Sequence, residues 1–413
     1  GCTLAAMTGN IGKSGGWASG IALQAGGGPV WNVFPVLENP VRAQIPSFLW
    51  SEAVLRGPEL TEKEGLVGID RLPHGIKMIW AVASNAIVNQ HANINRTIEI
   101  VKDTSKLEFF AVQDNFLTPT AQFADLVLPA CTQFETWGME DGWKYGEEVI
   151  LQPQILNPPG ETRSDYAICA AIAGKLGIGD HYTEGRNEKQ WVGALLDEYR
   201  DARFPERPTL NEFEEANLGV YARPVEEPRI AFEDFIDDPH AHPLPTPSGK
   251  IEIFCEEIFD RNLPEEAPAV PKYVQEWESP FGEEASKYPL QVIGTHFMPR
   301  VHSTFANCDW NQEAFPQRVF INPVDAQARG LKDGQKVRIF NDRGTVILPC
   351  RITRRILPGV INIPQGAWWK PDEEGNDVGG AVNTLTSERW SPFAFGNTQH
   401  TIMAEVAALG GGR

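Results

Sequence analysis

The sequence predicts an α/β protein in which a parallel, Rossmann-like sheet is followed by a C-terminal β-barrel. Three apolar runs of strand length, at residues 75–85, 107–114 and 124–130, alternate with a helical segment. Continuous apolar strands of this kind are typical of parallel strands joined by crossover helices. After residue 288 the pattern changes to short alternating strands with tight turns, which indicates a barrel.

Composition limits the class of protein. The chain has 413 residues, 42% of them hydrophobic, which is enough for two or three packed domains. Its formal charge of -19 argues against nucleic acid as a partner, because nucleic-acid binding needs clustered Lys and Arg. The six cysteines include no CxxC pair, so zinc and iron–sulfur sites have no support within this sequence. No window approaches the roughly 18 apolar residues that span a membrane, and no signal peptide is visible.

Polar side chains follow two of the predicted parallel strands at the point where each strand ends. Asn85 follows the first strand, Gln113 and Asp114 end the second, and Thr118 comes shortly after. Ligands of parallel sheets bind beyond the carboxyl ends of the strands, so we expect these side chains to meet at one edge. A carboxylate there can accept hydrogen bonds from the N1–H and amino groups of a guanine. The alternative for Asp114 is a cap on the turn that follows it.

A second polar group follows residues 290–293, an apolar run that predicts a short buried strand ended by Gly294. The next residues are rich in hydrogen-bond donors, namely Thr295, His296, Arg300, His302, Ser303 and Thr304. Arg offers a charged planar fork, His a switchable donor and Ser or Thr a hydroxyl, so the segment suits a polar, anionic, planar ligand. The alternative is a polar loop whose side chains bond one another.

Two further elements are expected from local signals. A helix at residues 162–177 would be capped by Ser164 or Asp165. Within residues 246–256, a turn followed by an alternating strand is expected.

Two segments of the last domain resemble the molybdopterin oxidoreductases, or dimethyl sulfoxide reductase family. They are THFMPRVHSTFANCDW at residues 295–310 and INPVDAQARGLKDGQKVRIFNDRGTV at residues 321–346. Several separate motifs recur in the family's order, and the nearest branch is that of the catalytic subunits of anaerobic dimethyl sulfoxide reductases. The resemblance implies that the barrel is a six-stranded double-psi barrel. It also implies a molybdenum bis(molybdopterin guanine dinucleotide) cofactor.

The resemblance gives expected roles to the polar residues. The strand ends at residues 85 and 113–118 would hold the guanosine part of one pterin dinucleotide, and Asp165 corresponds to an Asp that contacts the cofactor. A C-terminal segment would hydrogen-bond pterin edges or the diphosphate. Its residues are Asn383, Asn397, Gln399 and His400, and irregular packing is the alternative for them.

We expect Arg300, with His302 and Ser303, to face an anionic pterin or phosphate group in a crevice between the barrel and the sheet. An acidic chain must build a cationic site locally, and Arg grips oxyanions with two donors. The alternative is an exposed salt bridge to a carboxylate, which would contribute little to stability. No catalytic residue and no metal ligand is assigned within this sequence.

The beginning of the sequence differs from the start of a natural protein. It has no initiator Met, and its first residues predict the middle of a helix before a glycine-rich segment at residues 8–20. In the family a similar segment lies mid-chain, so the resemblance implies the C-terminal portion of a longer polypeptide. The remainder would carry any 4Fe-4S cluster and the protein ligand to molybdenum. The expected domains are residues 1–75, the tail of an α/β domain; 76–287, an α/β cofactor-binding domain; and 288–413, the dinucleotide-binding barrel.

The resemblance implies an enzyme that reduces dimethyl sulfoxide or a related S- or N-oxide by oxygen-atom transfer. Its expected partners are that small-molecule substrate, an iron–sulfur electron-transfer subunit and a membrane-anchor subunit, in the periplasm or cell envelope. One alternative is a different reaction on the same scaffold, such as thiosulfate, polysulfide, nitrate or selenate reduction, or a non-redox hydration. Another is a cofactor-binding fragment without turnover of its own. We expect this chain alone to be inactive, because its sequence offers no cluster cysteines and no assigned metal ligand.

Overall fold

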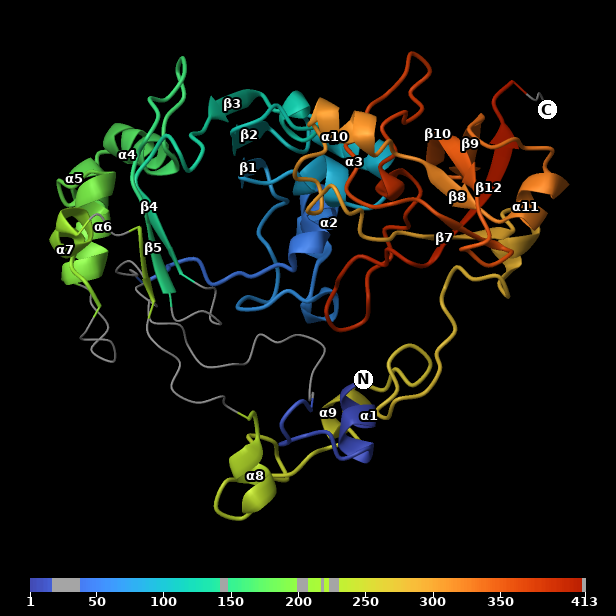
Figure 1. Ribbon diagram of the computed structural model, residues 1–413, viewed down its shortest axis with the longest axis horizontal. Coiled ribbons are helices and arrows are strands. Elements are labelled where there is room, and N and C mark those ends of the chain that lie inside the picture. Colours follow the sequence, from blue (N-terminus) through green and yellow to red (C-terminus); the bar gives the residue numbers. More distant parts are fainter. Residues whose placement is uncertain (17–37, 142–147, 199–206, 217–218, 223–229, 411–413) are drawn as a thin grey trace. The chain divides into compact units, whose positions relative to one another are not determined.

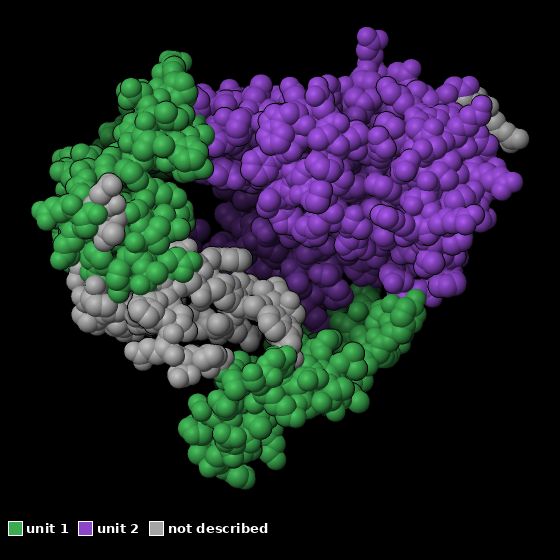
Figure 2. All heavy atoms as spheres, in the orientation of Figure 1, with its two compact units in different colours: residues 1–38, 130–274 green, residues 39–129, 275–413 purple. Residues whose placement is uncertain are grey.

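The structure is a computed structural model that describes residues 1–16, 38–141, 148–198, 207–216, 219–222 and 230–410. The chain forms two compact units, coloured separately in Figure 2. Unit 1 contains residues 1–38 and 130–274, and unit 2 contains residues 39–129 and 275–413. The three-domain division expected from the sequence stays a prediction, to which the structure adds that residues 39–129 pack with the C-terminal segment.

Unit 2 contains a three-stranded parallel sheet in the order β1-β2-β3 (Figure 1). The strands are β1 (Met78–Val82), β2 (Phe109–Asp114) and β3 (Leu126–Pro129), and both pairs are parallel. Helix α3 (Ile94–Lys102) forms the crossover from β1 to β2. Its apolar side packs against Phe110 of the sheet in one buried cluster. The predicted parallel sheet is therefore confirmed.

The second part of unit 2 is a closed six-stranded barrel in the order β10-β8-β11-β7-β12-β9. Its strands are β7 (Leu290–Ile293), β8 (Val319–Ile321), β9 (Lys336–Asn341), β10 (Gly344–Ile352), β11 (Val360–Asn362) and β12 (Ile402–Ala408). Alternate side chains fill the interior, so that Val337 and Ile339 of β9 are fully buried. The predicted six-stranded barrel is confirmed, and its double-psi topology stays a prediction.

Short helices complete unit 2. They are α2 (Trp50–Arg56), α10 (Asp309–Ala314) and α11 (Pro323–Ala328). Single helical turns lie at Ser47–Leu49, Gly57–Glu59, Glu62–Glu64, Ala86–Gln90, Ala121–Phe123, Glu283–Ser286 and Val382–Thr384. The Ala86–Gln90 turn has the wide π-helical geometry and directly follows Asn85.

Asn89, in this wide turn, joins the parallel sheet to loops of the barrel. Its Nδ2 donates to the backbone oxygen of Ala367 at 3.1 Å, and its Oδ1 accepts from the backbone N–H of Trp369 at 2.7 Å. Asn383 makes the reverse connection, since its Nδ2 donates to the backbone oxygens of Asn89 and Gln90 at 3.1 and 2.8 Å. Both side chains are buried, so their hydrogen bonds fix the position of the parallel sheet relative to the barrel loops.

Unit 1 contains an antiparallel sheet and a group of helices. The sheet consists of β4 (Gly138–Asp141), β5 (Glu148–Gln152) and β6 (Val220–Ala222). The helices are α1 (Cys2–Met7), α4 (Asp165–Lys175), α5 (Gly179–Thr183), α6 (Glu188–Asp197), α7 (Leu210–Glu215), α8 (Glu233–Asp237) and α9 (Glu256–Asp260). Ser164 caps α4 by accepting from the backbone N–H of Ala167 at 3.0 Å. Within the described residues, the helices are all too short or too polar to cross a membrane.

The strand expected within residues 246–256 is absent from the structure, so that prediction was wrong. The predicted turn is present, with the Gly249 N–H donating to the Thr246 oxygen at 2.9 Å. The following alternating residues form no strand and bend at Ile253 and Phe254, which remain 45% and 50% exposed. Alternation alone cannot make a strand, because the backbone groups need a neighbouring strand to bond.

Replacing Asn89 by Ala should destabilise unit 2 through the loss of its two buried contacts. The variant leaves the Ala367 oxygen and the Trp369 N–H without partners, and each orphaned group costs about 1–3 kcal/mol. We expect the free energy of unfolding, measured by urea titration, to fall by about 2–4 kcal/mol. Asn115→Ala, in an exposed loop, is the control and should change it little. Equal losses in the two variants would contradict the role given to Asn89.

Candidate cofactor site

The loops that Asn89 and Asn383 hold together enclose a cavity of about 290 Å³ within unit 2. Its lining combines the end of the parallel sheet with three loops of the barrel. The lining residues are Asn85, Asn89, Gln90, His302, Ser303, Gln365, Gly366, Ala367, Ala381, Val382, Asn383 and Gln399. Five of them had been expected from the sequence to contact a cofactor, and the fold brings these five together from segments spread over residues 85–399.

The lining is polar and, among the residues that the structure describes, contains no carboxylate. Six of its side chains are carboxamides, and the others that carry polar atoms are an imidazole and a hydroxyl. Carboxamides offer both donors and acceptors, which match the mixed edge of a heterocycle such as a pterin or guanine. In a chain with a formal charge of -19, a wall free of carboxylates avoids repelling an anionic ligand.

Asn85 carries the clearest unused donor of the cavity. It lies three residues beyond the end of β1, and its Oδ1 accepts from the backbone N–H of Thr120 at 3.1 Å. Its Nδ2 is buried and has no hydrogen-bond partner among the described residues. A buried donor without a partner costs free energy, and a ligand acceptor would remove that cost.

The other strand-end residues share this edge but do not line the cavity. Gln113 is fully buried opposite Val82, so the ends of β1 and β2 lie side by side. Asp114 accepts from the backbone N–H of Phe116 at 3.3 Å, which is the turn-capping alternative considered above. Thr118 is buried and accepts from the N–H of Ala121 at 3.2 Å. A contact of these three side chains with guanosine stays a prediction.

His302 and Ser303 reach the cavity through a tight loop after β7. His302 has a positive φ of 50°, and a Cβ added to Gly366 would lie 1.8 Å from the His302 oxygen. Only glycine therefore allows the two backbones to approach so closely. The Trp368 Nε1–H donates to the Ser303 oxygen at 2.9 Å and fixes the loop. His296 lies beside His302, with 5.3 Å between the ring centroids.

Arg300 lies behind the cavity wall and is not among the lining residues. Its Nη2 donates to the Gln317 Oε1 at 2.8 Å and to the backbone oxygen of Gln365 at 3.0 Å. Burial lowers the pKa of Arg300 to about 10, so it stays charged at neutral pH. No described carboxylate pairs with it, so the salt-bridge alternative has no support here. The guanidinium supports Gln365, a lining residue, and direct contact with an anionic ligand stays a prediction.

The remaining expected residues lie away from the lining. The Thr295 hydroxyl bonds the Asn362 side chain at 3.2 Å, and the His400 Nδ1 accepts from the Gly294 N–H at 3.5 Å. The Asn397 Nδ2 donates to the backbone oxygen of Gln90 at 3.4 Å.

Two other expected residues take part in local structure. Thr304 is exposed, and its backbone pairs with that of Val301. Asp165 begins α4 in unit 1, and its contact with a cofactor stays a prediction.

Asp377 is a buried residue that the sequence analysis missed. Its carboxylate accepts from the backbone N–H groups of Lys370, Gly379, Gly380 and Ala381 at 2.6–3.2 Å. These bonds shape the loop that presents Val382 and Asn383 to the cavity. Burial raises the pKa of Asp377 to about 6, although the backbone donors act against that rise. An Asp two residues before a pair of glycines indicates a turn, but a turn signal does not reveal burial.

Comparisons with known proteins agree with this geometry. Residues 2–175 match the family model described as molybdopterin oxidoreductase, and residues 290–403 match that of the Molydopterin dinucleotide binding domain. The chain belongs to the molybdopterin oxidoreductase family. Its cavity lies where the dinucleotide-binding domain, which contains His302 and Ser303, meets the parallel sheet of the other matched region, which contains Asn85.

Individual relatives cover nearly the whole chain. It is 40% identical to dimethyl sulfoxide reductase DmsA of Escherichia coli K12 over 98% of its residues, and 39% identical to the DmsA of Haemophilus influenzae over 98%. It spans only 50% and 51% of those two proteins, about half of their length. A dimethyl sulfoxide/trimethylamine N-oxide reductase of Cereibacter sphaeroides is 35% identical over 81% of this chain and 42% of its own length.

A solved structure shows the same fold. Acetylene hydratase from Pelobacter acetylenicus superposes with a TM-score of 0.62 at 22% identity, over 82% of this chain and 45% of that one.

Replacing Gly366 by Ala should disturb the His302 loop more than a matched glycine change elsewhere. Gly366 and Gly375 have nearly equal φ values, +88° and +85°, but a Cβ at Gly375 would meet nothing within 4 Å. Both variants carry the penalty for a positive φ, and only Gly366→Ala adds the clash with the His302 backbone. We expect Gly366→Ala to lower the free energy of unfolding by about 1–3 kcal/mol more than Gly375→Ala. Equal effects in thermal unfolding would contradict the close approach.

Asp377 should make stability depend on pH in the weakly acidic range. The pKa of Asp377 is raised from 3.8 to about 6 in the folded protein. Its contribution to the free energy of unfolding is therefore fully present below pH 3.8. As the pH rises toward 6, that contribution is lost, by up to roughly 3 kcal/mol. Between about pH 4 and pH 7, the unfolding free energy of the wild type should therefore fall relative to that of Asp377→Asn. Parallel pH profiles would show that Asp377 ionises normally.

Proposed function

We propose that this chain is part of a molybdenum bis(molybdopterin guanine dinucleotide) oxidoreductase that reduces dimethyl sulfoxide or a related S- or N-oxide. The proposal rests on membership of the family and on the relatives, whose names specify dimethyl sulfoxide or trimethylamine N-oxide. The observation that carries it is the cavity, whose described lining has no carboxylate and in which the buried Nδ2 of Asn85 has no partner among the described residues.

The cavity has the size of one ring system of such a cofactor and is too small for the whole cofactor. Its volume of about 290 Å³ lies near the lower limit of ligand pockets, which run from about 300 to 1,000 Å³. A planar heterocycle fits that size, and its mixed donor and acceptor edge matches the carboxamide lining.

The molybdenum of the bound cofactor would supply the oxygen-atom transfer. The residues of this chain would bind and orient the cofactor. Asn85 would donate its free Nδ2–H to an acceptor on the ring edge, and the Ser303 hydroxyl and His302 imidazole would bond from the opposite wall. Arg300 would act through the Gln365 backbone, keeping that wall in place and adding positive charge nearby.

Further contacts belong to the same proposal. Gln113, Asp114 and Thr118 would bind the guanosine part, and Asp165 would contribute another cofactor contact. Five residues outside the lining would bond the outer parts of the cofactor, namely Thr295, His296, Thr304, Asn397 and His400. The proposed enzyme also has a 4Fe-4S cluster in the parent polypeptide, an iron–sulfur partner subunit and a membrane-anchor subunit. Its proposed location is the periplasm or the cell envelope.

Asn85→Ala in the full-length enzyme tests the function and the site together. The variant removes a donor that has no partner within the described protein, and it also removes the Oδ1 that accepts from the Thr120 N–H at 3.1 Å, so a modest loss of stability is expected. The expected result is a severalfold lower content of molybdenum and pterin in the purified protein, with a smaller change in melting temperature. The wild type should oxidise reduced methyl viologen when dimethyl sulfoxide or trimethylamine N-oxide is added.

Each result has its own control. Asn157→Ala, at an exposed position of unit 1, should keep normal cofactor content. Full molybdenum occupancy in Asn85→Ala would overturn the assigned site but leave the proposed reaction standing. A fully loaded wild-type enzyme that reduces neither oxide would overturn the reaction.

A further inference from the structure

A group of cations lies at one end of the barrel, in a chain that is strongly acidic as a whole. The basic patch consists of Arg318, Lys332, Arg351, Arg354 and Arg355, of which all but the half-buried Arg318 are exposed. Strands β8 and β10 run parallel with Val319 opposite Cys350, which brings Arg318 near Arg351. The backbone of Lys332 accepts from the Cys350 Sγ at 3.0 Å, so this residue lies beside the same strand.

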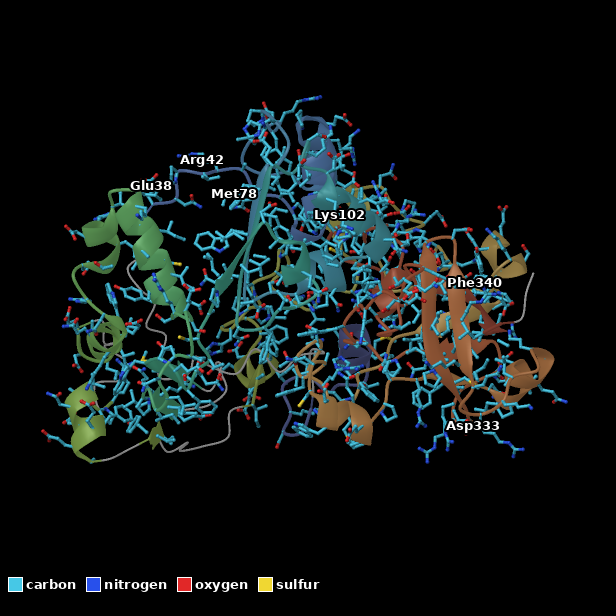
Figure 3. The ribbon with its side chains drawn as sticks, turned by 90° about the horizontal axis from the view of Figure 1, so that it is seen from above. Glu38, Arg42, Met78, Lys102, Asp333 and Phe340 are labelled. Atoms are coloured by element: carbon cyan, nitrogen blue, oxygen red, sulfur yellow. The ribbon has the colours of Figure 1, made fainter. Side chains whose placement is uncertain are left out.

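One carboxylate, Asp333, lies within the basic patch and neutralises only part of its charge. Its Oδ2 accepts from the Arg351 Nη1 at 2.7 Å, and its Oδ1 accepts from the Ile352 N–H at 2.8 Å. The Ile352 N–H, followed by the charges of Arg351 and Arg318, lowers the pKa of Asp333. Within the described parts of the chain, the other four cations of the patch form no ion pair. Figure 3 shows Asp333 at the barrel end of unit 2, away from Met78 of β1.

Two aliphatic side chains project beside the basic patch. Leu357 is 73% exposed and Val324 is 62% exposed, so most of each side chain is in contact with water. They lie close together, because the Asn322 Nδ2 donates to the Ile356 oxygen at 2.7 Å and the Gly359 N–H donates to the Asp325 Oδ2 at 2.8 Å. These bonds hold the turn that contains Leu357 against the start of α11.

We propose that the basic patch, with Leu357 and Val324, is a contact site for an anionic lipid surface. Peripheral proteins bind membranes through two features together: cations that are attracted to an anionic leaflet, and apolar side chains that enter the headgroup region. The charge of -19 makes most of the chain repel such a surface, so the patch would also set the orientation of binding. An acidic protein surface would satisfy the cations but would place the two aliphatic side chains against charged groups.

Sedimentation of the full-length holoenzyme with vesicles tests this proposal. The enzyme should bind vesicles that contain phosphatidylglycerol at least tenfold more tightly than vesicles of phosphatidylcholine alone. Raising the salt concentration should remove the preference, because the screening length falls from about 10 Å at 0.1 M to about 3 Å at 1 M. Equal binding to the two kinds of vesicle would overturn the proposal.

Matched variants locate the contact. Arg354→Glu/Arg355→Glu should weaken binding to the anionic vesicles at least tenfold, since each Lys or Arg near the surface contributes roughly a fivefold gain. Lys63→Glu/Arg71→Glu changes the net charge equally at exposed positions outside the patch and should have a much smaller effect. Leu357→Ala should weaken binding severalfold, whereas Leu176→Ala, at a position that is 70% exposed, should not.

Two outcomes would decide against a lipid contact at this site. Equal losses in the two double variants would mean that net charge, and not the patch, governs binding. Retention of the holoenzyme on immobilised polyglutamate without binding to anionic vesicles would show that the patch recognises acidic protein instead.

Discussion

The structure of unit 2 depends on a reciprocal exchange of hydrogen bonds between two buried carboxamides and the backbone. Asn89, beside the parallel sheet, bonds a barrel loop at Ala367 and Trp369, and Asn383 of the barrel bonds back to the turn that contains Asn89. Because these groups are buried, no water replaces a bond that is lost, and the geometry is strictly held. The cavity exists because this exchange fixes the distance between the two parts.

The two charged side chains near the cavity, Arg300 and Asp377, are stabilised by polar groups and not by opposite charges. Arg300 is a half-buried cation with no carboxylate partner among the described residues, and it is tolerated because carbonyl and carboxamide oxygens satisfy two of its donor positions. The buried Asp377 is treated in the same way, since backbone N–H groups and not cations surround it. Each charge is therefore held by dipoles, so no counter-ion competes with a bound ligand for the donors of the wall.

The sequence predicted the elements whose signals are local. The apolar runs placed the parallel strands, and the polar residues after their ends and after residue 293 included Asn85, His302 and Ser303, which line the cavity. Asn89 could not be predicted, because its partner Trp369 is 280 residues away and a buried Asn in a turn carries no pattern of its own. The strand expected within residues 246–256 failed for the same reason, since pairing is a property of two segments.

The chain order of unit 2 has a consequence for biosynthesis. Its first segment, residues 39–129, meets its second, residues 275–413, only after the whole of residues 130–274 has been made. Contacts across so long a loop form late, because closing the loop is entropically unfavourable and slow. Asn85 is translated before Ser303, so the cavity between them cannot form until the later segment has been made. A ligand that needs both walls can enter only after the barrel has folded against the parallel sheet.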